Sequence, residues 1–261
     1  MSGLVARRDP AVKLGVALVL SLVLVLVIDP VTPLLFVGAA WLAAVGLGGV
    51  RAGTFLRTLF PLAVVGLGFV WTNALFAVPV PGDTVWRIGP LFASASGVRF
   101  GIGIGLRGLA IGAISLAAIR TSDPTRLVVS LIRNARVPYR IGYAMLAAYR
   151  FFPIIGDEYA QIRLAQRVRG VRPRSLRARA SAALSGVVPL FADATRRATR
   201  IAVAMDARGF ASAGERTYWR ETPVTRADWL LAAAALALGG AIVAAGALGG
   251  WLELWTGRFA A

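Results

Sequence analysis

The sequence contains no cysteine and no histidine, and Lys13 is its only lysine. Without cysteine the chain can form neither a disulfide framework nor a thiolate metal site. Without histidine it lacks the commonest general base and the commonest metal ligand. The Gly-x-x-x-x-Gly-Lys pattern of a phosphate-binding loop is absent as well, so the chain does not carry the site of an ATPase of that type. We therefore predict no catalytic residues, no metal site and no cofactor.

Acidic residues are also few: 12 stand against 29 basic ones, which gives a net charge of +17. Hydrophobic residues make up 57% of the chain, a high share for a soluble domain. A basic excess is typical of proteins that bind nucleic acid, an anionic membrane surface or an acidic protein. The basic region has few aromatic side chains for stacking on bases, so we expect no nucleic-acid partner.

Five apolar stretches are long enough to cross a lipid bilayer, which takes about 20 residues. They are Ala11–Ile28, Leu34–Val50, Phe60–Val78, Gly101–Ile119 and Trp229–Trp251. Backbone groups in lipid must be satisfied within their own segment, so each stretch is predicted to be a helix. The predicted fold class is all-α, a polytopic membrane protein with about five transmembrane helices. Two shorter apolar runs, 141–155 and 180–191, leave six or seven crossings open.

The charge is concentrated between the fourth and fifth stretches. Residues 120–228 hold 20 of the 29 basic and 8 of the 12 acidic residues, a local net charge of +12. Positively charged segments stay on the cytoplasmic side of a membrane, so this block and the N-terminus are predicted to be cytoplasmic and the protein to lie in the plasma membrane. We predict three parts: transmembrane helices 1–4 over 1–119, a helical cytoplasmic region over 120–228, and the last transmembrane helix with a tail over 229–261.

Two predicted helices in the basic block end alike. One closes as Arg167-Val168-Arg169-Gly170 and the other as Ala207-Arg208-Gly209. A purely structural interpretation is available, because a cation near a helix C-terminus favours the helix dipole and the glycine adopts the left-handed cap. Arginine also pairs with carboxylates through two parallel hydrogen bonds. The same ending, used twice in one block, predicts a docking surface for a soluble partner.

Glycine recurs at close intervals in and just before the fourth apolar stretch. The positions are Gly97, Gly101, Gly105, Gly108 and Gly112. Part of this run fits the glycine pattern of a dinucleotide-binding loop, but it lies inside an apolar span without a strand–helix–strand unit around it. Intervals of four residues instead predict close helix packing, within the bundle or against a membrane partner. Arg107, in the same stretch, is open to a functional role or to a position at the membrane interface.

A series of short motifs runs along the chain. They are Asp9-Pro10-Ala11-Val12-Lys13-Leu14, Thr121-Ser122-Asp123-Pro124, Arg136-Val137-Pro138, Tyr149-Arg150-Phe151-Phe152-Pro153 and the two Arg-Gly ends. In this order and spacing, the chain resembles the transmembrane T component of energy-coupling factor transporters, a branch of the ABC transporters. The resemblance covers nearly the whole chain, from Asp9 to about Phe210. Val168 departs from it, because alanine is usual at that position.

The resemblance implies a function without chemistry of its own. In that family the T component joins two cytoplasmic ABC ATPase subunits to a small substrate-binding membrane subunit, for uptake of a vitamin or a metal ion. Two Ala-Arg-Gly helix ends dock into the ATPases, whose closure tips the substrate-binding subunit in the bilayer. For this chain it implies that Arg169 and Arg208 pair with ATPase carboxylates, while Gly170 and Gly209 permit close approach.

Two other classes of function would require residues that differ from those in this sequence. A membrane-embedded lipid or prenyl transferase would need histidine or paired carboxylates near the interface, and the only adjacent carboxylates are Asp157 and Glu158. A stand-alone secondary transporter would show ionisable residues at mid-bilayer in two matched halves, and no such repeat is visible. The sequence does not reveal the transported substrate.

Overall fold

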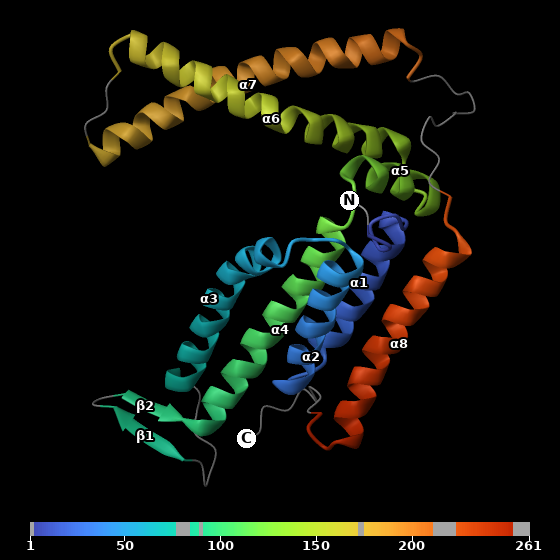
Figure 1. Ribbon diagram of the computed structural model, residues 1–261. Coiled ribbons are helices and arrows are strands. Elements are labelled where there is room, and N and C mark those ends of the chain that lie inside the picture. The colour runs from blue at the N-terminus through green and yellow to red at the C-terminus, as the bar shows by residue number, and fades with distance from the viewer. Residues whose placement is uncertain (1–2, 77–83, 89–90, 172–174, 211–222, 253–261) are drawn as a thin grey trace. The chain divides into compact units, whose positions relative to one another are not determined.

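A computed structural model describes residues 3–76, 84–88, 91–171, 175–210 and 223–252. The chain divides into two compact units (Figure 1). Unit 1 combines Met1–Val137 with Thr222–Ala261, and unit 2 is Pro138–Glu221. The division differs from the predicted boundaries at 119/120 and 228/229, because the first helix of the basic block packs with the apolar helices. The cytoplasmic location of 120–228 stays a prediction.

Unit 1 is a bundle of apolar helices. Its long elements are α1 (Pro10–Val25), α2 (Val31–Leu42), α3 (Ala52–Phe76), α4 (Ala95–Arg120) and α8 (Arg226–Leu248). A π-helical segment, η1 (Ala43–Leu47), directly extends α2. These elements match the five predicted stretches within a few residues at most ends. The exceptions are α3 and α4, which begin eight and six residues before their predicted starts.

The helix starts follow from local capping. Asp9 accepts hydrogen bonds from the N–H groups of Ala11 and Val12, and Pro10 occupies the first turn of α1. Thr225 and Asp228 form a reciprocal capping box at the start of α8. Such caps satisfy backbone donors that have no partner inside the helix, and so fix where each helix begins.

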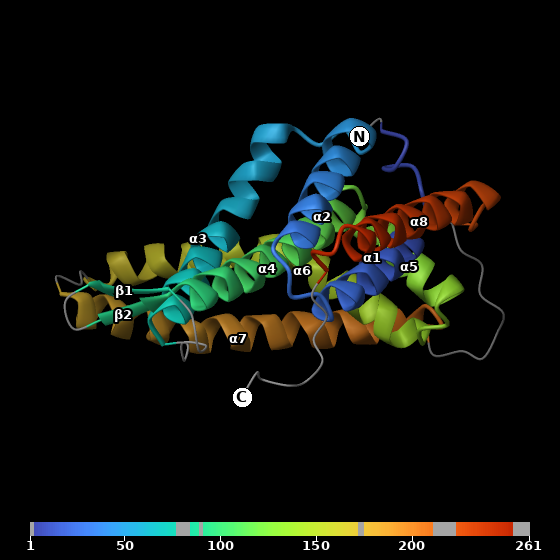
Figure 2. The ribbon, with the colours of Figure 1, turned by 90° about the horizontal axis from the view of Figure 1, so that it is seen from below.

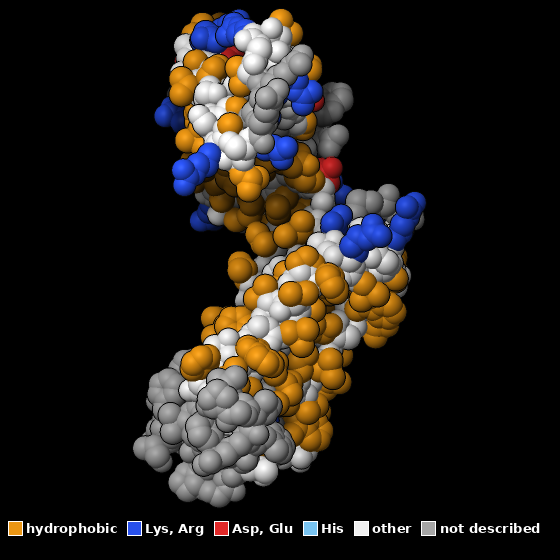
Figure 3. Space-filling view, turned by 90° about the vertical axis from the view of Figure 1, so that its left-hand side faces the viewer, with side chains coloured by type: hydrophobic (Ala, Val, Ile, Leu, Met, Phe, Trp, Pro, Cys, Tyr) orange, Lys and Arg blue, Asp and Glu red, His pale blue; other side chains and the backbone are white. Residues whose placement is uncertain are grey.

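Helix α4 lies at the centre of the bundle. It packs against α1, α2 and α3, while α8 packs against α1 and α2. Figure 2 shows the same neighbours from below. The buried core consists of Ala17, Leu24, Phe36, Ala40, Ala44, Phe55, Leu59, Ala110, Ala113 and Ile114. Most large apolar side chains remain outside this core, and on the face in Figure 3 they cover the bundle. Such a surface suits lipid, because a soluble protein rarely exposes large apolar patches.

Among the residues that the structure describes, three helices are long and apolar enough to cross a membrane by length and composition: α3, α4 and α8. The other two apolar elements, α1 and the α2–η1 pair, are shorter. The predicted class of all-α polytopic membrane protein is confirmed. A feature that the sequence did not predict is a hairpin in which β1 (Val85–Ile88) pairs antiparallel with β2 (Leu91–Ser94). The predicted tail beyond residue 252 lies outside the described residues.

The amphipathic helix α5 (Pro124–Asn134) belongs to unit 1 and packs on α1. Asp123 caps it with an acceptor for the Arg126 N–H, and Pro124 follows at the first helical position. Its buried residues, Val129, Ser130 and Ile132, share one side. Helix α5 therefore begins within the Thr121-Ser122-Asp123-Pro124 motif.

Unit 2 consists of two long helices, α6 (Tyr139–Val168) and α7 (Leu176–Ala207). A proline inside a helix commonly interrupts it, but α6 continues through Pro153 and α7 through Pro189. A proline removes one backbone donor and disfavours the residue before it. In helices of 30 and 32 residues, the remaining hydrogen bonds and packing keep the helix continuous.

Candidate docking site

Helix α6 ends in a Schellman cap built around Gly170. The Gly170 N–H donates to the carbonyl of Arg167 at 3.0 Å, and the Val171 N–H donates to the carbonyl of Gln166 at 3.0 Å. Gly170 has φ +84°, in the left-handed region that favours glycine. The sequence Arg-Gly therefore sets the end of this helix through backbone geometry.

Helix α7 ends in the same way around Gly209. The Gly209 N–H donates to the carbonyl of Asp206 at 2.9 Å, and the Phe210 N–H donates to the carbonyl of Met205 at 3.0 Å. Gly209 has φ +75°. The structural interpretation of the two endings is correct for both, and each cap holds its arginine in an equivalent place, just before the glycine.

The residues at these two ends are exposed. All seven predicted docking residues are open to the surroundings: Arg167, Val168, Arg169, Gly170, Ala207, Arg208 and Gly209. Val168, the departure from Ala-Arg-Gly, is 88% exposed, so the larger side chain takes no part in packing the helix end. Within the described part of the chain, neither Arg169 nor Arg208 forms an ion pair. Both guanidinium groups can thus reach an external carboxylate.

The two Arg-Gly ends lie at opposite ends of unit 2. Two contacts show that helices α6 and α7 run antiparallel. The start of α6, at Tyr139, meets Phe210 just beyond the end of α7, and Gln166 near the end of α6 meets Ala182 near the start of α7. Figure 1 shows the pair crossing, with the two C-termini far apart along it. The 32 residues of α7 span about 48 Å at 1.5 Å per residue. The two exposed Arg-Gly ends are therefore separated by about the length of α7.

Contacts that the sequence analysis missed join the two helices near the first Arg-Gly end. Gln166 donates from its amide to the Ala182 carbonyl and to the Ser185 hydroxyl, both at 3.1 Å. A Cβ on Gly186 would lie 3.3 Å from the Tyr159 ring, so glycine here lets the helices approach closely. No sequence signal identified this pairing, because the partners lie 16 to 19 residues apart on different helices.

An aromatic cluster holds the second Arg-Gly end. The rings of Tyr139 and Tyr143 meet Phe210 edge to face, with centroids 5.5 and 5.9 Å apart. Phe210 directly follows the capping glycine, where a Schellman cap commonly places an apolar contact. The Schellman pattern could have identified Phe210 from the sequence, whereas its two tyrosine partners are identified only by the tertiary structure.

A charged cluster lies where the helices cross. Arg197 of α7 pairs with Glu158 of α6 and, at 3.6 Å, with Asp193. The hydrogen bond between the two carboxyl groups raises the pKa of Glu158 and lowers the pKa of Asp193. The charged cluster, the Gln166 contacts and the aromatic cluster join α6 to α7 at three places along their length.

The opening motif of the chain forms a buried polar network inside unit 1. Besides capping α1, the Asp9 carboxylate accepts hydrogen bonds at 2.7 Å from the Ser130 hydroxyl of α5. The backbone N–H of Asp9 donates to the Asp228 carboxylate of α8 at 3.1 Å. Lys13 donates from Nζ to the Thr121 carbonyl at the end of α4, at 2.6 Å. These residues tie four helices together at one end of the bundle.

The predicted packing glycines of α4 have different surroundings. A Cβ on Gly105 would lie 2.8 Å from the Gly66 carbonyl oxygen, and one on Gly101 would lie 2.7 Å from the Val70 Cα, both on α3. Gly112 faces Leu62 of α3, and Gly97 is buried beside the Ser94 cap. Gly108 is exposed, with nothing near its Cβ position.

Arg107 points to the end of another helix. Its guanidinium donates to the carbonyls of Val25 at 3.1 Å and Val27 at 3.5 Å, just where α1 ends. The last carbonyls of a helix have no partner within it, and a cation there also favours the helix dipole. The geometry thus gives Arg107 a capping role that neither of the two interpretations from sequence included.

Comparison with known proteins identifies the family of this chain. The family model described as cobalt transport protein, CbiQ, matches residues 1–219. The chain belongs to the CbiQ family. It is 31% identical over 250 residues to the energy-coupling factor transporter transmembrane protein EcfT of Lacticaseibacillus paracasei, covering 92% of this chain and 93% of the relative. It is 32% identical over 232 residues to EcfT of Limosilactobacillus fermentum, covering 85% of each.

A third relative has a different form. The chain is 28% identical over 247 residues to a putative ABC transporter ATP-binding protein of Bifidobacterium longum, and the match covers 91% of this chain but only 31% of the relative. Family membership and the apolar helices together establish a multi-pass membrane component of a transporter.

Proposed function

We propose that this chain is the coupling subunit of an ATP-driven importer of the energy-coupling factor type. In this proposal, the exposed ends Arg169-Gly170 and Arg208-Gly209 each dock into one of two cytoplasmic ABC ATPase subunits. The observation that carries it is the pair of equivalent Schellman caps at opposite ends of unit 2, each with an exposed arginine that forms no ion pair among the described residues.

The relatives support a partnership with ATPases. A region similar to 91% of this chain occupies 31% of a protein named as a putative ABC transporter ATP-binding protein, which supports an association between such a region and an ATP-binding one. The other relatives are named as transmembrane proteins of the transporter, which supports a subunit that does not itself hydrolyse ATP. ATP hydrolysis then belongs to the partner subunits.

The contacts that join α6 to α7 support the transmission of movement through unit 2. If closure of the ATPase pair draws the two Arg-Gly ends together, the crossing helices turn with them, because Gln166, Glu158 and Phe210 hold α6 and α7 to each other. A second partner, a small substrate-binding membrane subunit, receives this movement within the bilayer. It selects the cargo, a vitamin or a metal ion. The N-terminus and residues 120–228 face the cytoplasm.

The docking assignment is tested by charge reversal at the intact motif. Arg208→Glu places a carboxylate opposite the partner carboxylate, so the ATPases should no longer co-purify with the chain. Truncating one member of a buried interface pair costs about 2–5 kcal/mol, which corresponds to about 30-fold or more in affinity. Co-purification of the ATPase pair with tagged chain measures the loss.

Arg179→Glu is the matched control, because Arg179 is an exposed arginine at the opposite end of α7 from Arg208. It should retain the ATPases. Changing Arg169 and Arg208 together should abolish transport while the protein still inserts into the membrane. Equal retention of the ATPases by Arg208→Glu and Arg179→Glu would exclude the docking role.

A further inference from the structure

The chain joins unit 2 to unit 1 at two points, and both lead to the same buried cluster. Helix α5 ends at Asn134, and unit 2 begins at Pro138. Unit 2 ends at Glu221, and the cap of α8 is Thr225. The end of α5 and the first turn of α8 both form hydrogen bonds with Asp9. One residue at the start of α1 therefore contacts the elements that precede and follow unit 2 in the chain.

The carboxylate of Asp9 holds the end of α5. It accepts hydrogen bonds from the Ser130 hydroxyl at 2.7 Å and from the Asn134 amide at 3.4 Å. The Asn134 amide also donates to the Ser130 hydroxyl at 2.9 Å. Ser130 is completely buried, and Asp9 is 3% exposed. Burying a carboxylate is costly unless hydrogen bonds stabilise its charge, so the carboxylate requires these donors to stay in place.

The backbone of Asp9 holds the start of α8. Its N–H donates to the Asp228 carboxylate at 3.1 Å. The same carboxylate accepts hydrogen bonds from the N–H and the hydroxyl of Thr225, both at 2.7 Å. Asp228 thus contacts both Asp9 and the residue through which the chain enters α8. A shift of Thr225 is passed to α1 through this one side chain.

The turn that follows α5 has little conformational freedom. Arg136 has φ +54°, in the left-handed region that residues other than glycine seldom adopt, and the Val137 N–H donates to the Leu131 carbonyl at 3.2 Å. A residue in such a conformation is held there by the contacts around it. Pro138 follows, and its ring fixes its own φ. This turn is therefore suited to pass a displacement of unit 2 to the end of α5.

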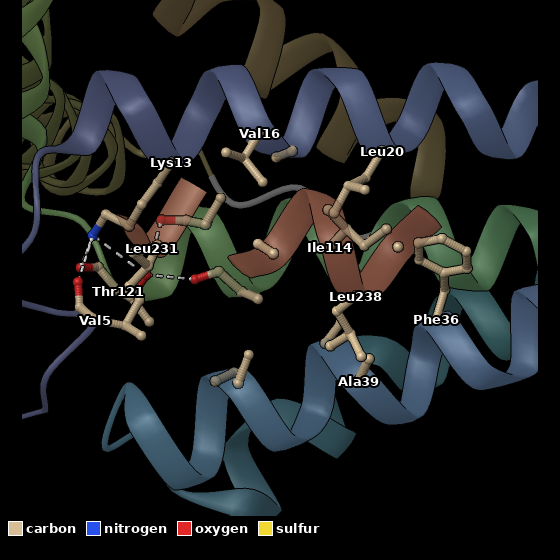
Figure 4. A pocket seen from close by; sticks show the side chains of 18 of the residues that line it. Val5, Lys13, Val16, Leu20, Phe36, Ala39, Ile114, Thr121, Leu231 and Leu238 are labelled. Carbon is tan, nitrogen blue, oxygen red and sulfur yellow. Dashed lines mark hydrogen bonds between the residues drawn. The ribbon is translucent and has the colours of Figure 1, made fainter. Parts of the chain in front are cut away.

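Helix α1 also connects the cluster to α4. One turn after Asp9, Lys13 donates from Nζ to the Thr121 carbonyl at 2.6 Å and to the Val5 carbonyl at 3.2 Å, as Figure 4 shows. Lys13 lies beside a mostly apolar cavity between α1, α2, α4 and α8, with about 740 Å³ of empty space, part of it open to the surroundings. The walls of a cavity lack packing partners on one side, so α1 is less constrained here than at its polar start.

We propose that Asp9 is a positioning residue that passes movement of unit 2 to α1. It holds the end of α5 and the start of α8 on the first turn of α1, so a displacement that enters through either connection reaches the apolar bundle at this residue. Coupling between distant parts of a protein is carried by such chains of hydrogen bonds and rigid elements. This role rests on the proposed function, because the docked ATPases supply the movement.

Hydrogen–deuterium exchange in the assembled complex tests the proposal. The tagged chain is purified with its two ATPases in mild detergent, and amide exchange is measured by mass spectrometry with and without a non-hydrolysable ATP analogue. The amides at the start of α1 report on the cluster directly, because the Ala11 and Val12 N–H groups donate to the Asp9 carboxylate. We expect the analogue to change exchange in α6 and α7 and also at the start of α1.

Ser130→Ala distinguishes transmission from stability. It removes the hydroxyl that joins α5 to Asp9, while the cap of α1 and the hydrogen bond to Asp228 stay in place. The analogue should still change exchange in α6 and α7 but no longer at the start of α1. A purely structural role would instead give faster exchange at α1 in both states and preserve the difference between them. If Ser130→Ala fails to fold, Asn134→Ala removes the other donor from an exposed position and should reduce the response of α1.

Ser122→Ala is the matched control. The Ser122 hydroxyl donates to the Ala118 carbonyl at 2.7 Å, outside the Asp9 cluster, so this variant should respond to the analogue as the unchanged chain does. A start of α1 that does not respond in the unchanged chain, or that responds as strongly in Ser130→Ala and Asn134→Ala, would overturn the proposal. Failure of the ATPases to co-purify, or of α6 and α7 to respond, would refute the proposed function and with it the role of Asp9.

Discussion

At the scale of single residues, charges inside the apolar part of the chain are matched by backbone groups. Arg107 donates to the carbonyls that end α1, and Asp29 accepts from the Thr32 N–H at 2.6 Å where α2 begins. A cation at a helix C-terminus and an anion at a helix N-terminus both favour the helix dipole. Arg107 therefore places a positive charge at the C-terminus of α1, and Asp29 places a negative charge at the N-terminus of α2.

Replacing Arg107 should destabilise this turn. Arg107→Leu leaves the Val25 and Val27 carbonyls without this charged donor, and a hydrogen bond to a charged group contributes about 1.5–3 kcal/mol. Thermal unfolding of the protein in detergent should show a lower midpoint. Arg57→Leu, at an exposed position on α3, should leave the midpoint unchanged. A midpoint for Arg107→Leu equal to that of Arg57→Leu would exclude the capping role.

At the scale of elements, α3 and α4 meet through glycine. Gly66 and Gly105 face each other so closely that a Cβ on Gly105 would lie 2.8 Å from a backbone oxygen. Between helices in lipid, such close approach supplies the packing that the hydrophobic effect does not. The spacing of the glycines predicted close packing, but only the fold shows that Gly101, Gly105 and Gly112 face α3 and that Gly108 does not.

Two alanine substitutions on the same helix test this difference. Gly105→Ala should force α3 and α4 apart and destabilise the protein by about 1–3 kcal/mol, the usual cost of overpacking. Gly108→Ala meets nothing within 4 Å and should be neutral or stabilise α4 by up to about 1 kcal/mol. Denaturation of both variants in the same detergent measures the contrast. Equal stability of the two would mean that the contact with α3 does not constrain the interface.

At the scale of the whole molecule, the chain combines an apolar bundle with a pair of crossing basic helices. Unit 1 buries few of its large apolar side chains, whereas the arginines of unit 2 are mostly exposed. This contrast fits one part in lipid and one part in water, since charged side chains are costly inside a membrane. The orientation across the membrane remains a prediction from the charge distribution.

The absence of cysteine makes the orientation easy to test, because a single introduced thiol is the only one to react. Thr84→Cys, before the β-hairpin, should react with a membrane-impermeant thiol reagent in intact cells. Ser175→Cys, at the start of α7, should react only after the membrane is permeabilised. Both positions are exposed, so burial does not hide either thiol. Labelling of Ser175→Cys in intact cells would contradict the cytoplasmic location of unit 2.

The sequence by itself determined the helical membrane class, the five apolar helices and the two capped Arg-Gly ends. These depend on local properties: length, apolar composition, and the rule that glycine takes the left-handed cap while arginine precedes it. The continuity of α6 and α7 through Pro153 and Pro189 does not follow from local patterns, because the cost of one proline is set against all the contacts of a long helix.

Only the tertiary structure decided which distant residues meet. It brought Asp9 to Ser130 and Asp228, Arg107 to the end of α1, and Phe210 to the start of α6. It also assigned α5 to the apolar bundle and opened the cavity beside Lys13. Such contacts follow from how whole helices pack, and the free energy of packing depends on shapes that local sequence patterns do not contain.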